Sequence, residues 1–283
     1  SDITIGGGVE SLTCVPMGGS IPRPHPEYSK SEARMYISMG LTAENVAKRY
    51  NITREQQDEF AYNSQMKASA AKAENKYSEI VATPAIRFTE KEDGTFQKET
   101  FLQEVDDGIR ESTTLEGLAK LRPAFSATGS VTAGNSSQMT DGAAATIIAC
   151  EEKVKELGLE PLAKLKHYTT AGCRPDEMGV GPLYAIPKLL KIAGMDLKDI
   201  DIFEINEAFA SQAIYCTREL GIDLAKVNLH GGAIALGHPL GCTGAKLCAT
   251  LLANMKATGA RYGIESMCIG GGMGAAALFE LCE

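Results

Sequence analysis

The chain has 283 residues, of which 44% are hydrophobic and 23% charged, and its formal net charge is −8. These values are ordinary for a globular protein with one large or two modest domains, and they exclude a disordered chain, a collagen-like fibre and a coiled coil. The acidic balance argues against a nucleic-acid partner, and no apolar run approaches the roughly 20 residues that a membrane span needs.

The first half of the chain is expected to be rich in surface. Thr53 and Gln56 fit a capping box, and the residues after them favour a helix. In chain order, the sequence predicts a strand end and turn over 1–12, an irregular excursion over 13–37, a helix over 55–72, an extended segment over 78–87 and a solvated hairpin or loop over 89–113.

Strands and helices alternate after residue 130. The predicted elements are a buried strand over 141–150, a helix over 151–157, a strand over 162–171, a helix over 185–194, a strand over 199–205 and a helix over 208–220. This alternation predicts the α/β class, with a sheet of buried parallel strands. The segments 142–150 and 274–282 share Gly-Ala-Ala-Ala at the start and Cys at the end, which indicates either coincidence or a duplicated α/β unit.

The first segment that can carry chemistry is Asn206-Glu207-Ala208-Phe209, directly after a predicted strand. An amide and a carboxylate at a strand end can place polar groups in a pocket. Asn and Glu also suit the first turn of a helix, so an ordinary helix start remains an alternative.

A second segment places five glycines around His238, between Gly231 and Gly244. Glycine allows close approach of the backbone to a ligand, and an imidazole acts as a base or donor near neutral pH. A structural histidine is the alternative interpretation.

The third segment is Cys268, which is followed after one residue by three glycines, Gly270 to Gly272. Backbone N–H groups can converge on an oxyanion there, and the thiol can be a nucleophile or a proton carrier. A buried cysteine acting as a small hydrophobe is the alternative. Asn, His and Cys on separate loops after strands favour acyl transfer at a carbonyl.

Metal binding and a disulfide scaffold have little support. The chain has eight cysteines but no Cys-x-x-Cys pair, and its four histidines are scattered. These features favour a reducing compartment and predict no metal site.

Together, the three segments resemble the thiolase family in order and spacing. The resemblance extends through GGGVES at 6–11, SMGLTAENVA at 38–47, DDGIR at 106–110, TAGNSSQ at 132–138 and MGVGP at 178–182. It is strongest to the degradative 3-ketoacyl-CoA thiolases, or acetyl-CoA acyltransferases, because Ser38 stands where biosynthetic acetoacetyl-CoA thiolases typically have His.

The resemblance implies roles for four residues. His238 would help to generate a thiolate and would hydrogen-bond the thioester oxygen, while Asn206 would hold a water that completes this oxyanion hole. Cys268 would carry protons, and the Gly270 amide would belong to a second oxyanion hole. Coenzyme A is implied as co-substrate, with no tightly bound cofactor, and the positions resembling its binding site and the acyl pocket are Arg110, Phe125, Ser137 and Met39.

One departure from the family is expected to matter. The family's nucleophilic cysteine lies in a Cys-Ser-Ser-Gly-like motif, whereas no cysteine here is followed by Ser and Cys14 precedes Val-Pro-Met. The chain begins with Ser1, so it is interpreted as a truncated or processed part of a thiolase that is inactive alone. A non-catalytic acyl-CoA-binding protein and a biosynthetic acetoacetyl-CoA thiolase are the alternatives. A condensing enzyme of the ketoacyl-synthase type fits less well.

The implied fold is a layered αβαβα arrangement of two similar halves with an inserted loop domain. The expected division is a remnant of the N-terminal half at 1–8 and 139–161, a CoA-binding insertion at 9–138 and the C-terminal half at 162–283. Family members are homodimers or homotetramers. Localisation is expected to be cytoplasmic in a bacterium, and otherwise peroxisomal or in the mitochondrial matrix.

Overall fold

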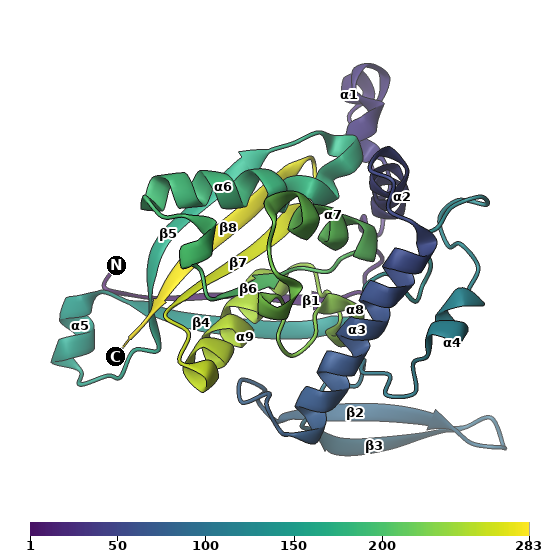
Figure 1. The fold of residues 1–283 in the computed structure, drawn as a ribbon. Helices are drawn as coiled ribbons and strands as arrows, with labels where there is room; N and C mark the ends of the chain where they lie inside the picture. The colour runs from purple at the N-terminus through teal and green to yellow at the C-terminus, as the bar shows by residue number, and fades with distance from the viewer. Residues whose placement is uncertain (283) are drawn as a thin grey trace.

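The computed structural model describes residues 1–282, which form a mixed α/β structure (Figure 1). The α/β class predicted from the sequence is therefore confirmed. In chain order the elements are β1 (Ile3–Ser11), α1 (Pro26–Ser31), α2 (Met39–Arg49), α3 (Arg54–Ala73), β2 (Thr83–Glu90), β3 (Phe96–Gln103), α4 (Leu115–Ala119), β4 (Asp141–Ala149), α5 (Glu151–Glu156), β5 (Ala163–Gly172), α6 (Gly181–Ala193), β6 (Ile202–Ile205), α7 (Ala210–Leu220), α8 (Ala233–Leu236), α9 (Thr243–Thr258), β7 (Tyr262–Ile269) and β8 (Met273–Leu281). Short 3-10 helices lie at Ala33–Tyr36, Pro175–Val180, Leu197–Asp199 and Leu224–Lys226.

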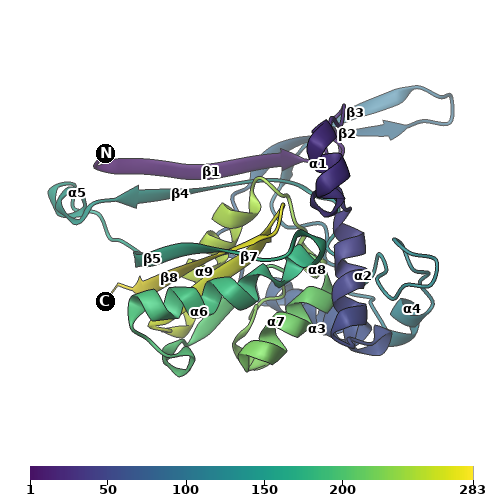
Figure 2. The ribbon, with the colours of Figure 1, turned by 90° about the horizontal axis from the view of Figure 1, so that it is seen from above.

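Four layers are stacked in the order helix, sheet, helix, ribbon. Helix α6 covers one face of the sheet β5-β8-β7-β6, and α9 packs between that sheet and the ribbon of β1 and β4 (Figure 2). The ribbon packs tightly against the loop that leads into α9. A Cβ added at Gly142 would lie only 2.8 Å from the Pro239 ring. This order corresponds to four of the five layers in the expected αβαβα arrangement.

The sheet is mixed, so the prediction of a parallel sheet was wrong. Only β6 and β7 run parallel, whereas β8 pairs antiparallel with both β5 and β7. Strands β7 and β8 are joined by a short turn that contains Gly271 and Gly272 at φ values of 87° and 96°, and such a tight connection requires antiparallel neighbours. The small side chains Ala275, Ala276 and Ala277 leave room on both faces of β8 for packing.

The prediction of a buried strand over 141–150 was right about the strand and wrong about its burial. Within residues 1–282 strand β4 pairs with β1 only, and Ile147 on one face is 72% exposed while Ile148 on the other is 49% exposed. A two-stranded ribbon presents two faces, and α9 packs against the ribbon without covering all of its apolar side chains. The echoing segment 274–282 contributes most of β8, whose residues 274–279 are buried in the sheet.

Short sequence patterns correctly predicted the positions of several helices and strands. Thr53 forms the predicted capping box with Gln56, and α3 starts at the next residue, Arg54. The polar stretch after residue 89 forms a hairpin of β2 and β3 that projects from the body (Figure 1). The stretch 13–37 is exposed, as expected for a surface excursion, but it contains α1 and a 3-10 turn rather than irregular backbone throughout.

The main core lies between the sheet and α6, and a second cluster lies at the carboxyl end of β7. The main core includes Ile186, Leu189, Phe203, Ile264 and Leu278. The second cluster joins α2, the 131 region, the segment after β6 and the end of β7, and consists of Ala43, Val131, Met178, Ala208, Phe209 and Cys268 with Met39 packed against it.

Candidate active site

Asn206 is held at the end of a buried strand. Every residue of β6 is buried, and the Asn206 N–H donates to the Ser266 carbonyl at 2.9 Å, which extends the parallel pairing of β6 with β7. Cys268 lies two residues further along β7. Because the carboxyl ends of neighbouring parallel strands meet at one edge of a sheet, Asn206 and Cys268 belong to the same edge.

His238 reaches Asn206 from the loop between α8 and α9. Its Nε2 lies 3.2 Å from Asn206 Nδ2, and its Nδ1 lies 2.6 Å from Thr243 Oγ1. The Thr243 hydroxyl donates to the Pro239 carbonyl, so its oxygen accepts the proton of Nδ1. This assigns the Nδ1–H tautomer and leaves Nε2 as an acceptor directed at the Asn206 amide.

The imidazole of His238 is held in the neutral form. Burial lowers its pKa to about 4, with a smaller contribution from the positive charge of Lys246. A neutral ring with a free Nε2 lone pair can accept a proton near neutral pH, and once protonated it can donate to an oxygen.

The other end of the Asn206 amide has no partner among residues 1–282. Asn206 is 1% exposed, and its Oδ1 is buried without a hydrogen bond. A buried acceptor without a partner is costly, so this oxygen is suited to a donor that the chain itself does not supply, such as a water.

Cys268 is joined to Asn206 through Gln212 on α7. The Gln212 Nε2 lies 3.5 Å from Cys268 Sγ and 3.5 Å from the Asn206 carbonyl oxygen. Burial raises the pKa of the Cys268 thiol, and the hydrogen bond from Gln212 opposes this shift. His238, Asn206, Gln212 and Cys268 therefore form one continuous chain of polar contacts.

Gly270 offers an open backbone amide beside this thiol. It is exposed, a Cβ at this position would meet nothing within 4 Å, and its N–H makes no hydrogen bond with another described residue. The neighbouring Gly272 is needed for a different reason, since a Cβ there would lie 2.5 Å from the Cys173 carbonyl. The turn is thus shaped so that the Gly270 N–H is available to an external acceptor.

Three of the four positions expected to bind CoA or the acyl chain lie against the segment after β6. The Ser137 N–H donates to the Ala208 carbonyl at 2.9 Å. The Phe125 ring meets Phe209 edge to face at 5.8 Å between centroids. Met39 packs against the cluster that contains Phe209 and Cys268.

Arg110 lies apart from the other three expected positions. Its N–H donates to Gln65 Oε1, and Gln65 Nε2 donates to the Ile234 carbonyl on α8, which leads to His238. The guanidinium is exposed and forms no ion pair within the part of the chain that the structure describes.

Sequence reasoning singled out the Glu207 carboxylate without assigning it a role, and it missed Gln212. The Glu207 carboxyl is 2% exposed and accepts from Ser64 Oγ at 2.6 Å, Asn228 Nδ2 at 2.7 Å and the Ile234 N–H at 3.3 Å. It thereby joins α3, the loop before α8, and α8 itself. Both residues lie within six positions of Asn206, and a polar residue on the buried side of α7 is the signal that could have identified Gln212.

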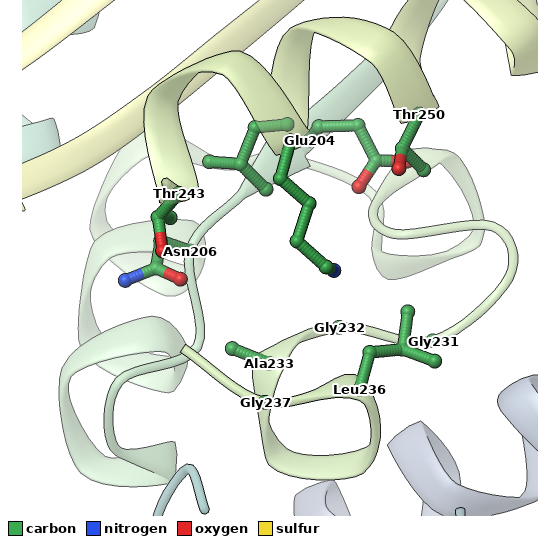
Figure 3. Close-up of a pocket in the computed structure, with 11 residues that line it drawn as sticks. Glu204, Asn206, Gly231, Gly232, Ala233, Leu236, Gly237, Thr243 and Thr250 are labelled. Atoms are coloured by element: carbon green, nitrogen blue, oxygen red, sulfur yellow. The ribbon is translucent and has the colours of Figure 1, made fainter. Parts of the chain in front are cut away.

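A narrow polar pocket adjoins Asn206, and Figure 3 shows its lining. Asn206 and Thr243 lie on one side, Glu204 and Thr250 on another, and the glycine loop closes the third. Burial raises the pKa of Glu204 to about 8. His238 and Cys268 do not line this pocket.

Within residues 1–282, no cluster of three or more His, Cys, Asp or Glu side chains could hold a metal ion. None of the helices described there combines the length and apolar character of a membrane span.

Comparison with known proteins places both halves of the chain in one family. Residues 1–152 match the family described as "Thiolase, N-terminal domain", and residues 159–281 match "Thiolase, C-terminal domain". The chain is 51% identical over 282 residues to the 3-ketoacyl-CoA thiolase of Bacillus subtilis, covering 99% of this chain and 72% of that protein. It is 52% identical over 283 residues to the peroxisomal 3-ketoacyl-CoA thiolase B of Mus musculus, covering 99% and 66%.

Solved structures with similar folds include the dimeric peroxisomal thiolase of Saccharomyces cerevisiae. It superposes with a TM-score of 0.86 at 46% identity, over 99% of this chain and 70% of that one. The human mitochondrial 3-ketoacyl-CoA thiolase in complex with CoA gives a TM-score of 0.86 at 37% identity, over 100% of this chain and 72% of that one.

Proposed function

Because this chain belongs to the thiolase family, we propose that the protein is an acyltransferase that cleaves 3-ketoacyl-CoA with CoA to give acyl-CoA and acetyl-CoA. The observation that carries the proposal is the contact between His238 Nε2 and the Asn206 amide, at the sheet edge that also holds the Cys268 thiol. The names of the relatives support the degradative subclass and a role in fatty-acid β-oxidation.

The four site residues divide the chemistry between two oxyanion sites and a proton carrier. The neutral His238 ring takes a proton and so helps to generate a thiolate; once protonated it donates to the thioester oxygen, and a water on the unsatisfied Asn206 Oδ1 completes that site. Gly270 supplies an unpartnered N–H to the second site. Carbon–carbon cleavage places negative charge on oxygen, and preorganised donors of this kind stabilise it.

Cys268 is the proton carrier in this proposal. A nucleophilic thiolate, of the kind that the family resemblance implies, first adds to the keto carbon. The bond between the α-carbon and that carbon then breaks, the acyl group stays on the nucleophile as a thioester, and the electron pair of the broken bond goes to the acetyl-CoA enolate. Carbon then takes the proton of Cys268 Sγ–H, and sulfur keeps the bonding pair as a thiolate. The thiolate next removes the thiol proton of the incoming CoA, which restores Cys268 and activates the attacking sulfur.

Coenzyme A is proposed as a co-substrate that is not tightly bound. Arg110 carries an exposed guanidinium, which forms no ion pair with residues 1–282 and is suited to the phosphates of the nucleotide end. Phe125 is 41% exposed and offers a ring face to the adenine. Ser137 is proposed for the pantetheine, and Met39, which packs against the cluster that contains Cys268, for the acyl chain. A related protein solved in complex with CoA supports this assignment.

We further propose that none of the eight cysteines in this chain is the acyl-accepting nucleophile. No cysteine is followed by Ser, and Cys14, the one nearest the start, is exposed in a turn after β1. On this basis the 283 residues alone bind acyl-CoA without turning it over. The chain spans 66% to 72% of the length of the relatives above, so the activity is proposed for the protein as it exists in its source.

We propose that the chain divides into two similar halves and an insertion and that it assembles as a homo-oligomer. The pairing of β1 with β4 supports one unit made of 1–8 and 139–161, interrupted by the insertion 9–138 and followed by the half 162–283. A dimeric relative supports a homodimer or homotetramer. Bacterial and peroxisomal relatives support the cytoplasm of a bacterium or, otherwise, the peroxisome or mitochondrial matrix.

The test of the reaction is CoA-dependent loss of 3-ketoacyl-CoA by the protein purified from its source. Cys268→Ser should lower kcat by about 10²-fold or more, because general acid–base groups contribute about 10²–10⁴-fold. Cys248→Ser changes a half-buried thiol on α9 and is the matched control, expected to keep full turnover. Undiminished turnover in Cys268→Ser would falsify the proton-carrier role.

The test of the missing nucleophile is peptide mass spectrometry after incubation with acetyl-CoA. No acetyl group should be found on any of the eight cysteines of this chain. A stable acetyl-cysteine at one of them, Cys14 for example, would contradict this part of the proposal while leaving the reaction intact. Calorimetric binding of CoA by the protein from its source, with no acylated cysteine and no turnover, would instead favour a non-catalytic acyl-CoA-binding protein.

A further inference from the structure

Gln212 is a fully buried amide whose surroundings leave it one orientation. It is 2% exposed on α7, and its Nε2 donates to the Asn206 carbonyl. Gly179 packs against the opposite end, since a Cβ there would lie 2.6 Å from Gln212 Oε1. The carboxamide is therefore held between Gly179 and the segment after β6, with no solvent to satisfy it.

The same carboxamide faces the sulfur of Cys268 with both of its polar atoms. Nε2 lies 3.5 Å from Sγ and acts as a donor to it, and Sγ can donate to Oε1 at 4.0 Å. A thiolate needs a donor and a thiol needs an acceptor. An amide is a side chain that offers both without changing its own charge.

Within residues 1–282, no charged side chain forms a hydrogen bond with Cys268. Two other thiols, those of Cys173 and Cys216, interact electrostatically with Cys268, and burial raises the pKa of Cys173 to about 11 and that of Cys216 further. Glu177, which acts on Cys173, is engaged by Arg49 at 2.7 Å. Both thiols are thus neutral at physiological pH, and the amide is the polar partner that Cys268 contacts.

We propose that Gln212 is a positioning residue for Cys268, which it holds at the Asn206 end of the sheet and supports in both protonation states, by Oε1 as a thiol and by Nε2 as a thiolate. The inference rests on the proposed function for the role of Cys268, and on the contacts above for the role of Gln212. It predicts that the amide lowers the free-energy difference between thiol and thiolate at this buried position.

The experiment measures the alkylation rate of each cysteine by iodoacetamide between pH 6 and 10, with peptide mass spectrometry, on the whole protein from its source. Gln212→Met keeps the length and removes both polar atoms. Cys268 should then react about fivefold more slowly at pH 8, as expected for the loss of one hydrogen bond of about 1 kcal/mol to the thiolate. Gln212→Glu, which adds a negative charge at the same position, should slow it further.

Two internal reporters separate this effect from unfolding. Exposed Cys14 should react at the same rate in every variant, and buried Cys216 should stay protected. Gln57→Met is the matched control, because Gln57 is an equally buried amide that contacts Ile52, Thr53 and Ser130 instead of a thiol. It should leave the alkylation of Cys268 unchanged.

If Gln212→Met does not fold, Gln212→Asn replaces it in the experiment. The shorter side chain leaves the amide one methylene short of Cys268 Sγ, so alkylation of Cys268 should slow by the same factor. Cys268 reacting as fast in these variants as in the wild-type protein, with Cys216 still protected, would overturn the inference. The readout needs no turnover, so a protein that fails the thiolase assay can still show the slowing, and an active one can still lack it.

Discussion

Gly232→Ala tests whether Glu207 holds the loop that presents His238. Gly232 has φ −125°, which alanine adopts freely, so any cost comes from the added methyl group and not from the backbone. That methyl would overlap the Glu207 carboxyl group. The carboxyl cannot turn aside without giving up its donors from Ser64 and Asn228, at 2.6 Å and 2.7 Å.

The magnitude follows from two costs. Overpacking a tight interior costs about 1–3 kcal/mol, and leaving a buried polar group without its hydrogen bond costs about 1–3 kcal/mol. The free energy of unfolding should therefore fall by about 2–6 kcal/mol, which corresponds to a loss of about 3–10 °C in Tm for a chain of this size. Because a shift of about 1 Å in a catalytic group can cost about 10²-fold, kcat should fall by a similar factor.

The assay is thermal unfolding followed by circular dichroism, combined with a double-mutant cycle. In a Glu207→Ala background the overlap is gone, so Gly232→Ala should then cost less than about 1 kcal/mol. Gly172→Ala is the control, because a Cβ there meets nothing within 4 Å, and it should leave Tm unchanged. An equal cost of Gly232→Ala in both backgrounds would refute the reasoning, since the penalty would not come from Glu207.

Three further predictions concern helix stability, pH and CoA. Thr53→Ala removes the capping box of α3 and should lower the free energy of unfolding by about 0.5–2 kcal/mol in urea titrations, whereas an unchanged midpoint would mean that the cap is unimportant. Glu204 has a pKa of about 8 in the folded state, above its ordinary value, so the folded chain retains a proton that the unfolded chain releases. The free energy of unfolding should therefore fall as the pH rises from about 4.5 to 8. Glu204→Gln should flatten that part of the stability profile. Equal slopes for the two proteins would argue against a buried, protonated Glu204. Arg110→Ala should raise KM for the CoA thioester about tenfold with little change in kcat. The control is Arg87→Ala, on the β2–β3 hairpin, which should leave both constants unchanged. A fall in kcat alone for Arg110→Ala would place Arg110 outside the CoA site.

Prediction from sequence succeeded where a few neighbouring residues decide the outcome. The capping box at Thr53 depends on contacts three residues apart, and α3 begins as the sequence predicts. The motifs around Asn206, His238 and Cys268 were also recognisable as chemistry, because amide, imidazole and thiol groups beside strand ends and glycines suit acyl transfer. The α/β class followed from the alternation of strand and helix patterns.

The tertiary structure decided those features that depend on contacts between residues distant in the sequence. The apolar residues of β4 predict burial, yet Ile147 is exposed because, within residues 1–282, α9 packs against one face of the ribbon and leaves the other face to solvent. A run of small residues such as 275–277 does not encode the direction of its neighbours, and so the mixed sheet was not predictable. In the sequence, Gln212 has the pattern of an ordinary helix residue. Its role depends on the packing of α7 against the end of β7, which places its amide 3.5 Å from Cys268 Sγ. Composition and spacing determine which groups are available, but which of them touch is set by the packing of whole elements against one another.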